Sequence, residues 1–480
     1  MDKMKASIDI NAKISHLISQ CNNPQIYSNI IGELFVYGIE KPSKVIDSLN
    51  ILPKLGDEEI TINFNKNINK IITTIKEIIS KPSHEMYKVL SCIYGAFLGD
   101  AMGAFCEFHK PNKNNSKMIF NSGMTVIGGV PGQVTDDSEM ALSLAYAIMD
   151  NPIKEELSVD YIYFYYGAWF KTNPLDYGYT TEASLKPFDF IKFNPNAHNF
   201  GLIETSILQS NFNSLSNGFL MRKCTFIAWL YYRFYGEINQ IFSDIDNSKG
   251  LLELYKKIKH LSYADNKCTN PSEQANSVSA VYCLIALMAI KGLTANVIIH
   301  YISNLCRDSQ FRNNSNDEKF IAEIILHYIN LFSSKNYEFN KVFGDLNSQE
   351  CVFHNMGYYL HALKLTLYFL YQFDYIEPNQ QETKYRTIMN QICDLGGDTD
   401  TNCCIVGAVI GPLIGMANFG NELIKIIELI PPYRKIYSVA LALLLVIYLK
   451  KSNEDEKLVQ NNKYFLKQIL TMLYGDIDLN

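Results

Sequence analysis

Apolar residues recur every three or four positions through several segments of the chain, and this spacing predicts amphipathic helices. The pattern includes Ile14 and Leu17 near the N-terminus and Met140 and Leu144 further along. The longest apolar run, 437–449, is bracketed by basic residues and is too short to span a bilayer. We therefore expect it to form a buried helix near the C-terminus, and we expect no membrane-spanning segment.

The segment 1–84 carries none of the polar clusters described below, and we predict that it forms a helical unit ahead of a larger domain at 85–480. Prolines and an acidic turn at 57–59 separate its helical patterns. Two interpretations stay open: a packing extension of the larger domain, or an accessory module that contacts a partner. Proteolysis near Ser80 that releases a stable piece would favour the module.

An acidic, hydroxyl-bearing cluster at 134–138 (VTDDS) directly precedes one of the helical patterns. Such a position predicts a helix N-terminus, with Thr135 as the capping residue. Asp136 and Asp137 would then lie in the first turn of that helix.

A second cluster at 396–401 (GGDTDT) also precedes a helical pattern. Its two glycines allow a tight turn with positive φ, so that Asp398 and Asp400 project from a sharply bent backbone. Glycine then recurs every fourth residue over 407–415. This repeat leaves a smooth stripe where another helix can approach closely, so we expect the second helix to be central to the fold.

The two clusters together indicate a site for divalent cations. Carboxylate and hydroxyl oxygens are the hard ligands that Mg²⁺, Mn²⁺ and Ca²⁺ prefer, and crowded carboxylates repel one another unless a cation neutralises them. One cluster alone would be an ordinary helix cap, but two clusters that meet in space would hold two cations. Zinc is disfavoured, because the 9 His and 11 Cys form neither an HExxH nor a CxxC motif.

Composition narrows the class of protein. The 480 residues are 48% hydrophobic, which is enough for a large core. The cysteines follow no disulfide framework and the first residues form no secretory signal, so we expect an intracellular, cytoplasmic location. A net charge of -6 argues against a general nucleic-acid binder.

Several spaced motifs resemble those of the ADP-ribosylglycohydrolase family and occur in the same order. The resemblance spans about 88–435 and implies an all-α, roughly orthogonal multi-helix bundle, with two Mg²⁺ ions, or Mn²⁺ in their place, in a cleft that receives ADP-ribose. The motifs before the second acidic cluster are 95–107 (GAFLGDAMGAFCE), 135–137 (TDD), 169–181 (WFKTNPLDYGYTT), 214–222 (SLSNGFLMR) and 356–363 (MGYYLHAL).

The resemblance also implies roles for individual residues. It implies metal ligands at Thr135, Asp136, Asp137, Asp398, Asp400 and Thr401. It implies substrate contacts at Glu107, Tyr179, Ser214, Ser216, Asn217, Gly218, Met221 and Asn270. Asp136 or Asp176 is assigned to water activation or leaving-group handling, with Glu107 as a second acid or base, because carboxylates stabilise an oxocarbenium-like transition state.

Two positions depart from the family pattern. Asn270 stands where family members carry a histidine that reaches the substrate, and asparagine can donate a hydrogen bond but cannot become cationic. Tyr179 stands where the nitrogenase-regulating branch has asparagine. Arg222 and Lys223 follow the fourth motif, and they are expected either to face the diphosphate or to form a solvated pair.

The function implied is Mg²⁺-dependent hydrolysis of the glycosidic bond between ADP-ribose and a modified protein side chain, with arginine favoured by the 174–176 segment. The alternatives are an ADP-ribose-binding protein without turnover and a purely structural protein of the same fold. The segment 110–117 follows Glu107 and is interpreted as a mobile lid over the cleft or as a plain surface loop.

Overall fold

The computed structural model describes residues 85–420, except for the segments 122–124, 130–132, 152–155, 172–173, 191–192, 198, 244–247, 335–336 and 379–381. All regular elements in the described residues are helices, and one isolated bridge joins Ser216 to Tyr358. The predicted all-α class is therefore confirmed. The predicted unit at 1–84 and the apolar run at 437–449 lie outside the described residues.

Seventeen α-helices form the described part of the chain, joined by short loops and 3-10 turns. The helices are α5 (Glu85–Gly103), α6 (Asp136–Asp150), α7 (Val159–Phe170), α8 (Tyr179–Leu185), α9 (Gly201–Asn211), α10 (Gly218–Met221), α11 (Lys223–Arg233), α12 (Tyr235–Ile241), α13 (Ser248–Asn266), α14 (Glu273–Lys291), α15 (Ala295–Arg307), α16 (Ser309–Arg312), α17 (Asn316–Phe332), α18 (Phe339–Phe343), α19 (Tyr359–Tyr371), α20 (Lys384–Leu395) and α21 (Thr399–Ile414). The 3-10 turns are η3 (Asn115–Met118), η4 (Lys186–Phe190), η5 (Pro195–Ala197), η6 (Phe373–Tyr375) and η7 (Met416–Asn418).

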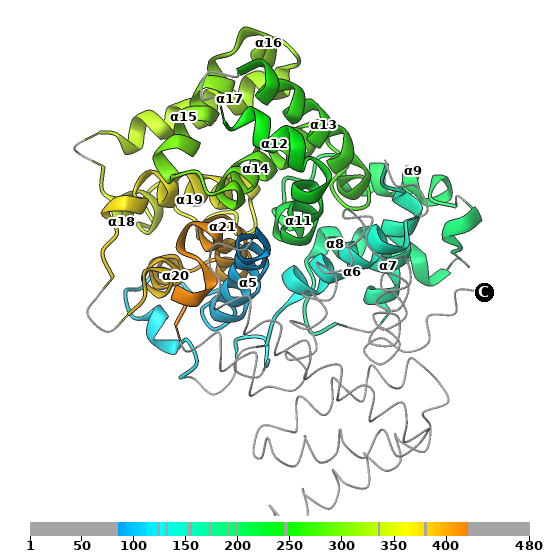
Figure 1. Cartoon of the computed structure of the whole chain (residues 1–480). Coiled ribbons are helices and arrows are strands. Elements are labelled where there is room, and N and C mark those ends of the chain that lie inside the picture. Colours follow the sequence, from blue (N-terminus) through cyan, green and yellow to red (C-terminus); the bar gives the residue numbers. More distant parts are fainter. Residues whose placement is uncertain are drawn as a thin grey trace, which may run out of the picture.

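Helices α5 and α21 come from opposite ends of the described residues and lie side by side near the centre of the fold (Figure 1). Their contact is built on glycine from both helices. A Cβ atom on Gly95 would lie 2.3 Å from the carbonyl oxygen of Gly407, and one on Gly99 would lie 2.3 Å from that of Cys403. The close approach predicted from the glycine repeat is confirmed, and the glycines of α5 supply its other half.

Helix α14 is the one helix in the described residues that is long and apolar enough to cross a membrane, but 89% of its apolar window is buried inside the protein. Its ends carry local signals that fix its length. Ser272 accepts a hydrogen bond from the backbone N–H of Ala275, and Gly292 ends the helix with φ +91°. Because of this burial, α14 serves as a core helix that supports α21.

The segment 110–117 does not form a lid in this structure. The backbone N–H of Ser116 donates to Asp394 Oδ1 at 2.9 Å, and that of Asn112 donates to the carbonyl of Asp394 at 2.8 Å. These bonds attach the segment to the end of α20, and none of its residues lines the pocket described below. The lid interpretation is therefore wrong, because the segment uses its polar groups to join two parts of the fold.

All ten cysteines in the described residues are buried free thiols. Their burial agrees with the expectation that the fold needs no disulfide framework, because each thiol behaves as a small apolar side chain in the core.

Candidate active site

The first acidic cluster lies at the N-terminus of α6, as predicted, but its cap comes from another helix. Thr135 occupies the capping position, yet its own side chain makes no capping bond. Instead, Asp100 of α5 accepts hydrogen bonds from the backbone N–H groups of Thr135 at 3.0 Å and Ser138 at 3.2 Å. Asp100 was missed in the sequence, where its only signal was a carboxylate within an apolar helical pattern. It fixes the turn that presents Asp136 and Asp137.

The second acidic cluster begins in the predicted glycine turn. Gly396 and Gly397 have φ values of +66° and +80°. The backbone N–H of Phe108 donates to the carbonyl of Gly397 at 2.8 Å, and the N–H of Gly397 donates to the carbonyl of His109 at 2.9 Å. A Cβ atom on Gly396 would lie only 2.0 Å from that carbonyl oxygen of His109. These reciprocal bonds hold the turn against the segment that carries Glu107.

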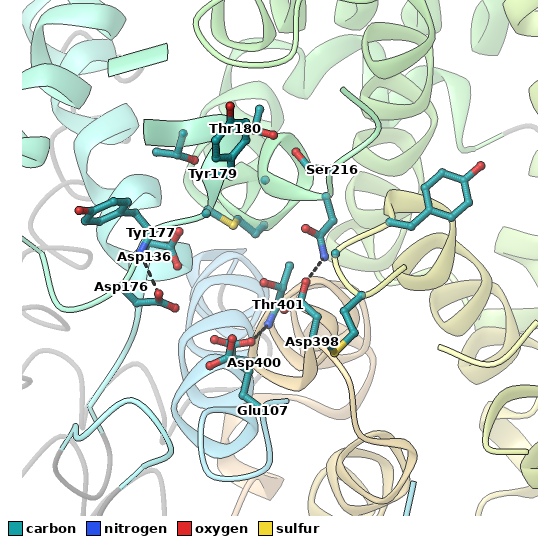
Figure 2. A pocket seen from close by; sticks show the side chains of 18 of the residues that line it. Glu107, Asp136, Asp176, Tyr177, Tyr179, Thr180, Ser216, Asp398, Asp400 and Thr401 are labelled. Atoms are coloured by element: carbon teal, nitrogen blue, oxygen red, sulfur yellow. Dashed lines mark hydrogen bonds between the residues drawn. The ribbon is translucent and has the colours of Figure 1, made fainter. Parts of the chain in front are cut away.

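The two clusters meet, as the metal hypothesis requires. Thr401 donates to Asp137 Oδ2 at 3.4 Å, and Thr135 donates to the same oxygen at 3.0 Å. Beside them, Glu107, Asp398 and Asp400 each offer one carboxylate oxygen, and these three atoms all lie within 4.8 Å of one another. Glu107 and Asp400 point toward one another in Figure 2.

We call the five carboxylates of this region the acidic end of the pocket: Glu107, Asp136, Asp137, Asp398 and Asp400. Burial, followed by the neighbouring carboxylates, raises the pKa of Glu107 to about 9. Burial also raises the pKa values of Asp136, Asp137 and Asp400 well above the usual range. The buried oxygens Asp137 Oδ1 and Glu107 Oε2 have no hydrogen-bond partner. Unpartnered hard oxygens under mutual repulsion fit a divalent cation.

Glu107 therefore has a second candidate role that the sequence did not indicate. It was assigned to substrate contact and acid–base chemistry, whereas the structure groups it with Asp398 and Asp400 as three donors able to share one metal ion. Nothing in the local sequence around Glu107 could reveal this grouping, because it depends on the backbone bonds between 108–109 and 397.

A cavity of about 790 Å³ opens above the acidic end. None of the described residues that line it is Lys, Arg or His. Of the site residues expected from sequence, those lining it are Glu107, Asp136, Asp176, Tyr179, Ser216, Asn217, Gly218, Met221, Asp398, Asp400 and Thr401. Those that do not line it are Thr135, Asp137, Ser214 and Asn270.

One side of the cavity is formed by the loop before α8 and the start of that helix. Asp176 accepts a hydrogen bond from the backbone N–H of Tyr177 at 2.9 Å, and it lies on the same side as Asp136 in Figure 2. Burial raises the pKa of Asp176. Tyr179 is 83% exposed and stands at the rim. This side therefore combines a partly buried carboxylate with an aromatic ring that is free to contact an incoming molecule.

The opposite side is formed by residues 215–218, which belong to the segment 214–218, here called the serine loop. Its backbone is fixed by Gly357, whose carbonyl accepts from the N–H of Asn217 at 2.7 Å. The side-chain amide of Asn217 donates to Asp398 Oδ2 at 2.7 Å, so the serine loop orients a carboxylate of the acidic end (Figure 2). Residues 355–358 also line the cavity. The motif 356–363 therefore contributes both to the lining and to the start of α19, which begins at Tyr359.

Comparison with known proteins decides the family. The family model described as ADP-ribosylglycohydrolase matches residues 82–453. The chain belongs to the ADP-ribosylglycohydrolase family. The resemblance inferred from the motifs is confirmed, and with it the assignment as a hydrolase of ADP-ribose linkages.

Two relatives carry names that agree with this assignment to the ADP-ribosylglycohydrolases. A protein of Acanthamoeba polyphaga mimivirus that is named as an ADP-ribosyl glycohydrolase is 27% identical over 335 residues, which cover 67% of this chain and 86% of the relative. The ADP-ribosyl-[dinitrogen reductase] glycohydrolase of Rhodospirillum rubrum is 31% identical over 104 residues, covering 21% of this chain and 34% of that protein. A solved structure titled ADP-ribosylglycohydrolase-related protein complex aligns with 76% of this chain and 99% of its own, at 17% identity and a TM-score of 0.48.

In this member of the ADP-ribosylglycohydrolase family, Arg222 and Lys223 neither line the cavity nor lie in solvent. Both side chains are fully buried, and both pair with Asp265. The Arg222 Nε to Asp265 Oδ1 distance is 3.0 Å. The two expectations from sequence are wrong, because the tertiary fold supplies a buried carboxylate that the local sequence does not show.

Proposed function

We propose that this protein is a Mg²⁺-dependent hydrolase that cleaves the glycosidic bond between ADP-ribose and a modified protein side chain, with arginine as the favoured side chain. One observation carries the proposal: five carboxylates line one cavity whose described lining holds no cationic side chain, and they are Glu107, Asp136, Asp176, Asp398 and Asp400. Such a cavity needs a cation from outside the chain to balance its charge.

Two groups of donors support two ions. Glu107, Asp398 and Asp400 form the first group. The second group is centred on Asp136 and Asp137, with the hydroxyls of Thr135 and Thr401 beside them. Mg²⁺ suits these oxygen donors, and Mn²⁺ has the same preference for carboxylates.

When bound, such ions would lower the pKa of a water molecule and orient the ribose hydroxyls. The residues of the chain supply the rest. Asp176 lies outside the group of Glu107, Asp398 and Asp400 and faces the cavity, so we assign it to the leaving-group side. Burial raises its pKa, so it holds a proton more readily than an exposed carboxylate does. Asp136, next to it, is the alternative for the same step, and the negative field of both stabilises an oxocarbenium-like transition state.

The charge of the cavity also supports arginine as the modified residue. A guanidinium leaving group is cationic and presents several donors, which carboxylates such as Asp176 and Asp136 accept well. In ADP-ribosyl-serine the glycosidic oxygen carries neither a proton nor a charge, so it offers these carboxylates no donor. The electrostatic preference therefore runs toward arginine.

The test is release of free ADP-ribose from arginine-modified and serine-modified proteins in parallel, with Mg²⁺ and with a chelator. We expect Mg²⁺-dependent release, faster from arginine. Tight binding of ADP-ribose without release from either substrate would instead favour the binding-protein alternative, which the departures at Asn270 and Tyr179 support. Release that a chelator leaves unchanged would contradict the metal requirement.

A further inference from the structure

The cavity proposed to take ADP-ribose has no cationic side chain among its described lining residues, although the ligand carries a diphosphate. Behind the serine loop, however, a line of hydrogen bonds leads to a buried guanidinium. Arg222 Nη2 donates to Thr269 Oγ1 at 2.8 Å, Thr269 Oγ1 donates to Asn270 Oδ1 at 2.9 Å, and Asn270 Nδ2 donates to Ser216 Oγ at 3.0 Å. Of these residues only Ser216 lines the cavity.

Arg222, at the buried end of this line, fixes which group donates and which accepts in each hydrogen bond. A guanidinium group can only donate, so Thr269 must accept from Arg222 and direct its one proton to Asn270. Asn270 therefore presents its carbonyl oxygen to Thr269 and its amide N–H groups to the serine loop. Ser216 Oγ accepts from that amide at 3.0 Å and also from Ser214 Oγ at 3.3 Å.

The proton of Ser216 is consequently left to donate toward the cavity. Among the described residues, the hydrogen bonds of Ser216 Oγ are ones that it accepts. A hydroxyl held in this state favours a ligand group that only accepts, such as a phosphate oxygen, and disfavours one that only donates.

The guanidinium that sets this direction is itself immobilised. Asp265 accepts from Arg222 Nε at 3.0 Å and from the hydroxyl of Tyr166 at 2.6 Å, and it also pairs with Lys223. All of these charged side chains are fully buried. Two cations face one carboxylate there, so the fold places an excess positive charge behind the serine loop, where low polarisability strengthens its effect.

We propose that Asn270 is a positioning residue that transmits the bond direction set by Arg222 and thereby holds Ser216 as a hydrogen-bond donor to the diphosphate of the substrate. The identity of that ligand rests on the proposed function. Asn270 is fully buried and does not reach the cavity, so it acts through Ser216. An amide suits this position because it offers an acceptor at one end and a donor at the other.

The test compares Asn270→Leu, which has a similar volume and no hydrogen bonds, with Asn270→His, whose ring can accept at one nitrogen and donate at the other. ADP-ribose binding is measured by calorimetry in the full chain, with adenosine as a probe that lacks the diphosphate. We expect Asn270→Leu to weaken ADP-ribose binding roughly tenfold to a hundredfold, to leave adenosine binding unchanged, and to raise KM more than it lowers kcat. Asn270→His should restore most of the affinity.

A double-mutant cycle with Ser216→Ala separates positioning from general damage to the fold. Ser216→Ala alone should match the loss in Asn270→Leu, and the double variant should lose little more than either. Additive losses, or equal losses for adenosine and ADP-ribose, would overturn the proposal. Thermal unfolding with and without Mg²⁺ checks that each variant keeps a folded acidic end.

This design keeps the proposal separate from the proposed function. If the wild type binds ADP-ribose but releases none from modified proteins, hydrolysis fails while the binding comparison still decides the role of Asn270. If the wild type binds adenosine and not ADP-ribose, the positioning proposal fails, because Ser216 then has no diphosphate to contact.

Discussion

The acidic end of the pocket and the interior behind the serine loop both bury several charged side chains, and they balance them differently. At the acidic end, carboxylates stand together and no cationic side chain lies among the described lining residues. Behind the serine loop, Arg222 and Lys223 enclose Asp265. Burial raises the pKa of Glu107 to about 9, whereas the pKa of Asp265 is lowered by the two neighbouring cations, which together outweigh the opposing effect of burial.

The difference separates a functional arrangement of charge from a structural one. A buried group with compensated charge holds its geometry by itself, and breaking it destabilises the fold. A buried group with uncompensated charge is costly until a ligand arrives, and it is therefore a candidate for binding. Hydrogen bonds of the serine loop connect the acidic end to the buried charges behind the loop. A substitution in one region can therefore be tested for its effect on the other.

The largest effect is expected from Asp400→Ala at the acidic end. It removes one of three grouped carboxylates, so Mg²⁺-linked stabilisation and ADP-ribose release should be lost together. We expect turnover to fall by more than about 100-fold, because even partners of metal ligands cost 10–100-fold when changed. Turnover is measured by ADP-ribose release, and Mg²⁺-linked stabilisation is measured by thermal unfolding with and without Mg²⁺. Asp374→Ala, at an exposed carboxylate, is the control, and full activity in Asp400→Ala would refute the metal assignment.

The second-largest effect is on stability and concerns the buried charges behind the serine loop, where Asp265 pairs with Arg222 and Lys223. Asp265→Asn keeps the shape but leaves Arg222 and Lys223 buried without a counter-charge. We expect a loss of about 3–5 kcal/mol in the free energy of unfolding, measured by denaturant titration. Glu253→Gln removes an ion pair with Lys256 in which both side chains are about half exposed, and it should cost less than about 1 kcal/mol. Equal costs for the two variants would contradict the contrast drawn above.

A smaller loss is expected where α5 and α21 hold the two acidic clusters together. Gly99→Ala places a Cβ atom 2.3 Å from a backbone carbonyl of α21, so we expect a loss of about 1–3 kcal/mol from forced separation of the helices. Gly236→Ala is the matched control, because it lies in α12 with no atom within 4 Å of the added carbon. This control should be neutral or stabilising by about 0.5–1 kcal/mol. A Gly99→Ala protein as stable as the wild type would show that the contact can relax.

The mildest effect is a pH dependence that distinguishes the ion-free from the ion-bound protein. Glu107 has a pKa of about 9 in the folded state and an ordinary value of 4.5. The folded form therefore binds more protons than the unfolded chain between these values, and the free energy of unfolding should fall as pH rises through that range. Glu107→Gln should flatten this slope in chelator. Added Mg²⁺ should flatten or reverse it, because the ion favours the charged carboxylates. If neither Glu107→Gln nor Mg²⁺ changes this slope, groups other than Glu107 cause the pH dependence.

Local sequence determined much of the acidic end. The helix N-termini at Asp136 and Thr399, the positive φ values of Gly396 and Gly397, and the close packing along α21 all follow from residues within a few positions of one another. Glycine conformation and helical spacing act over one or two turns, so a single sequence contains them. The spaced motifs added the family and the all-α class.

Only the tertiary structure decided which groups share one environment. Glu107 joins Asp398 through backbone bonds between segments almost 300 residues apart, and Asp100 caps a helix other than its own. Asn270, expected to contact the substrate, lies behind the cavity and contacts Ser216 instead. Arg222 pairs with Asp265, which is 43 residues away in sequence. Burial, pKa and bond direction depend on such long-range neighbours, and the free energies involved belong to contacts that exist only when the chain is folded.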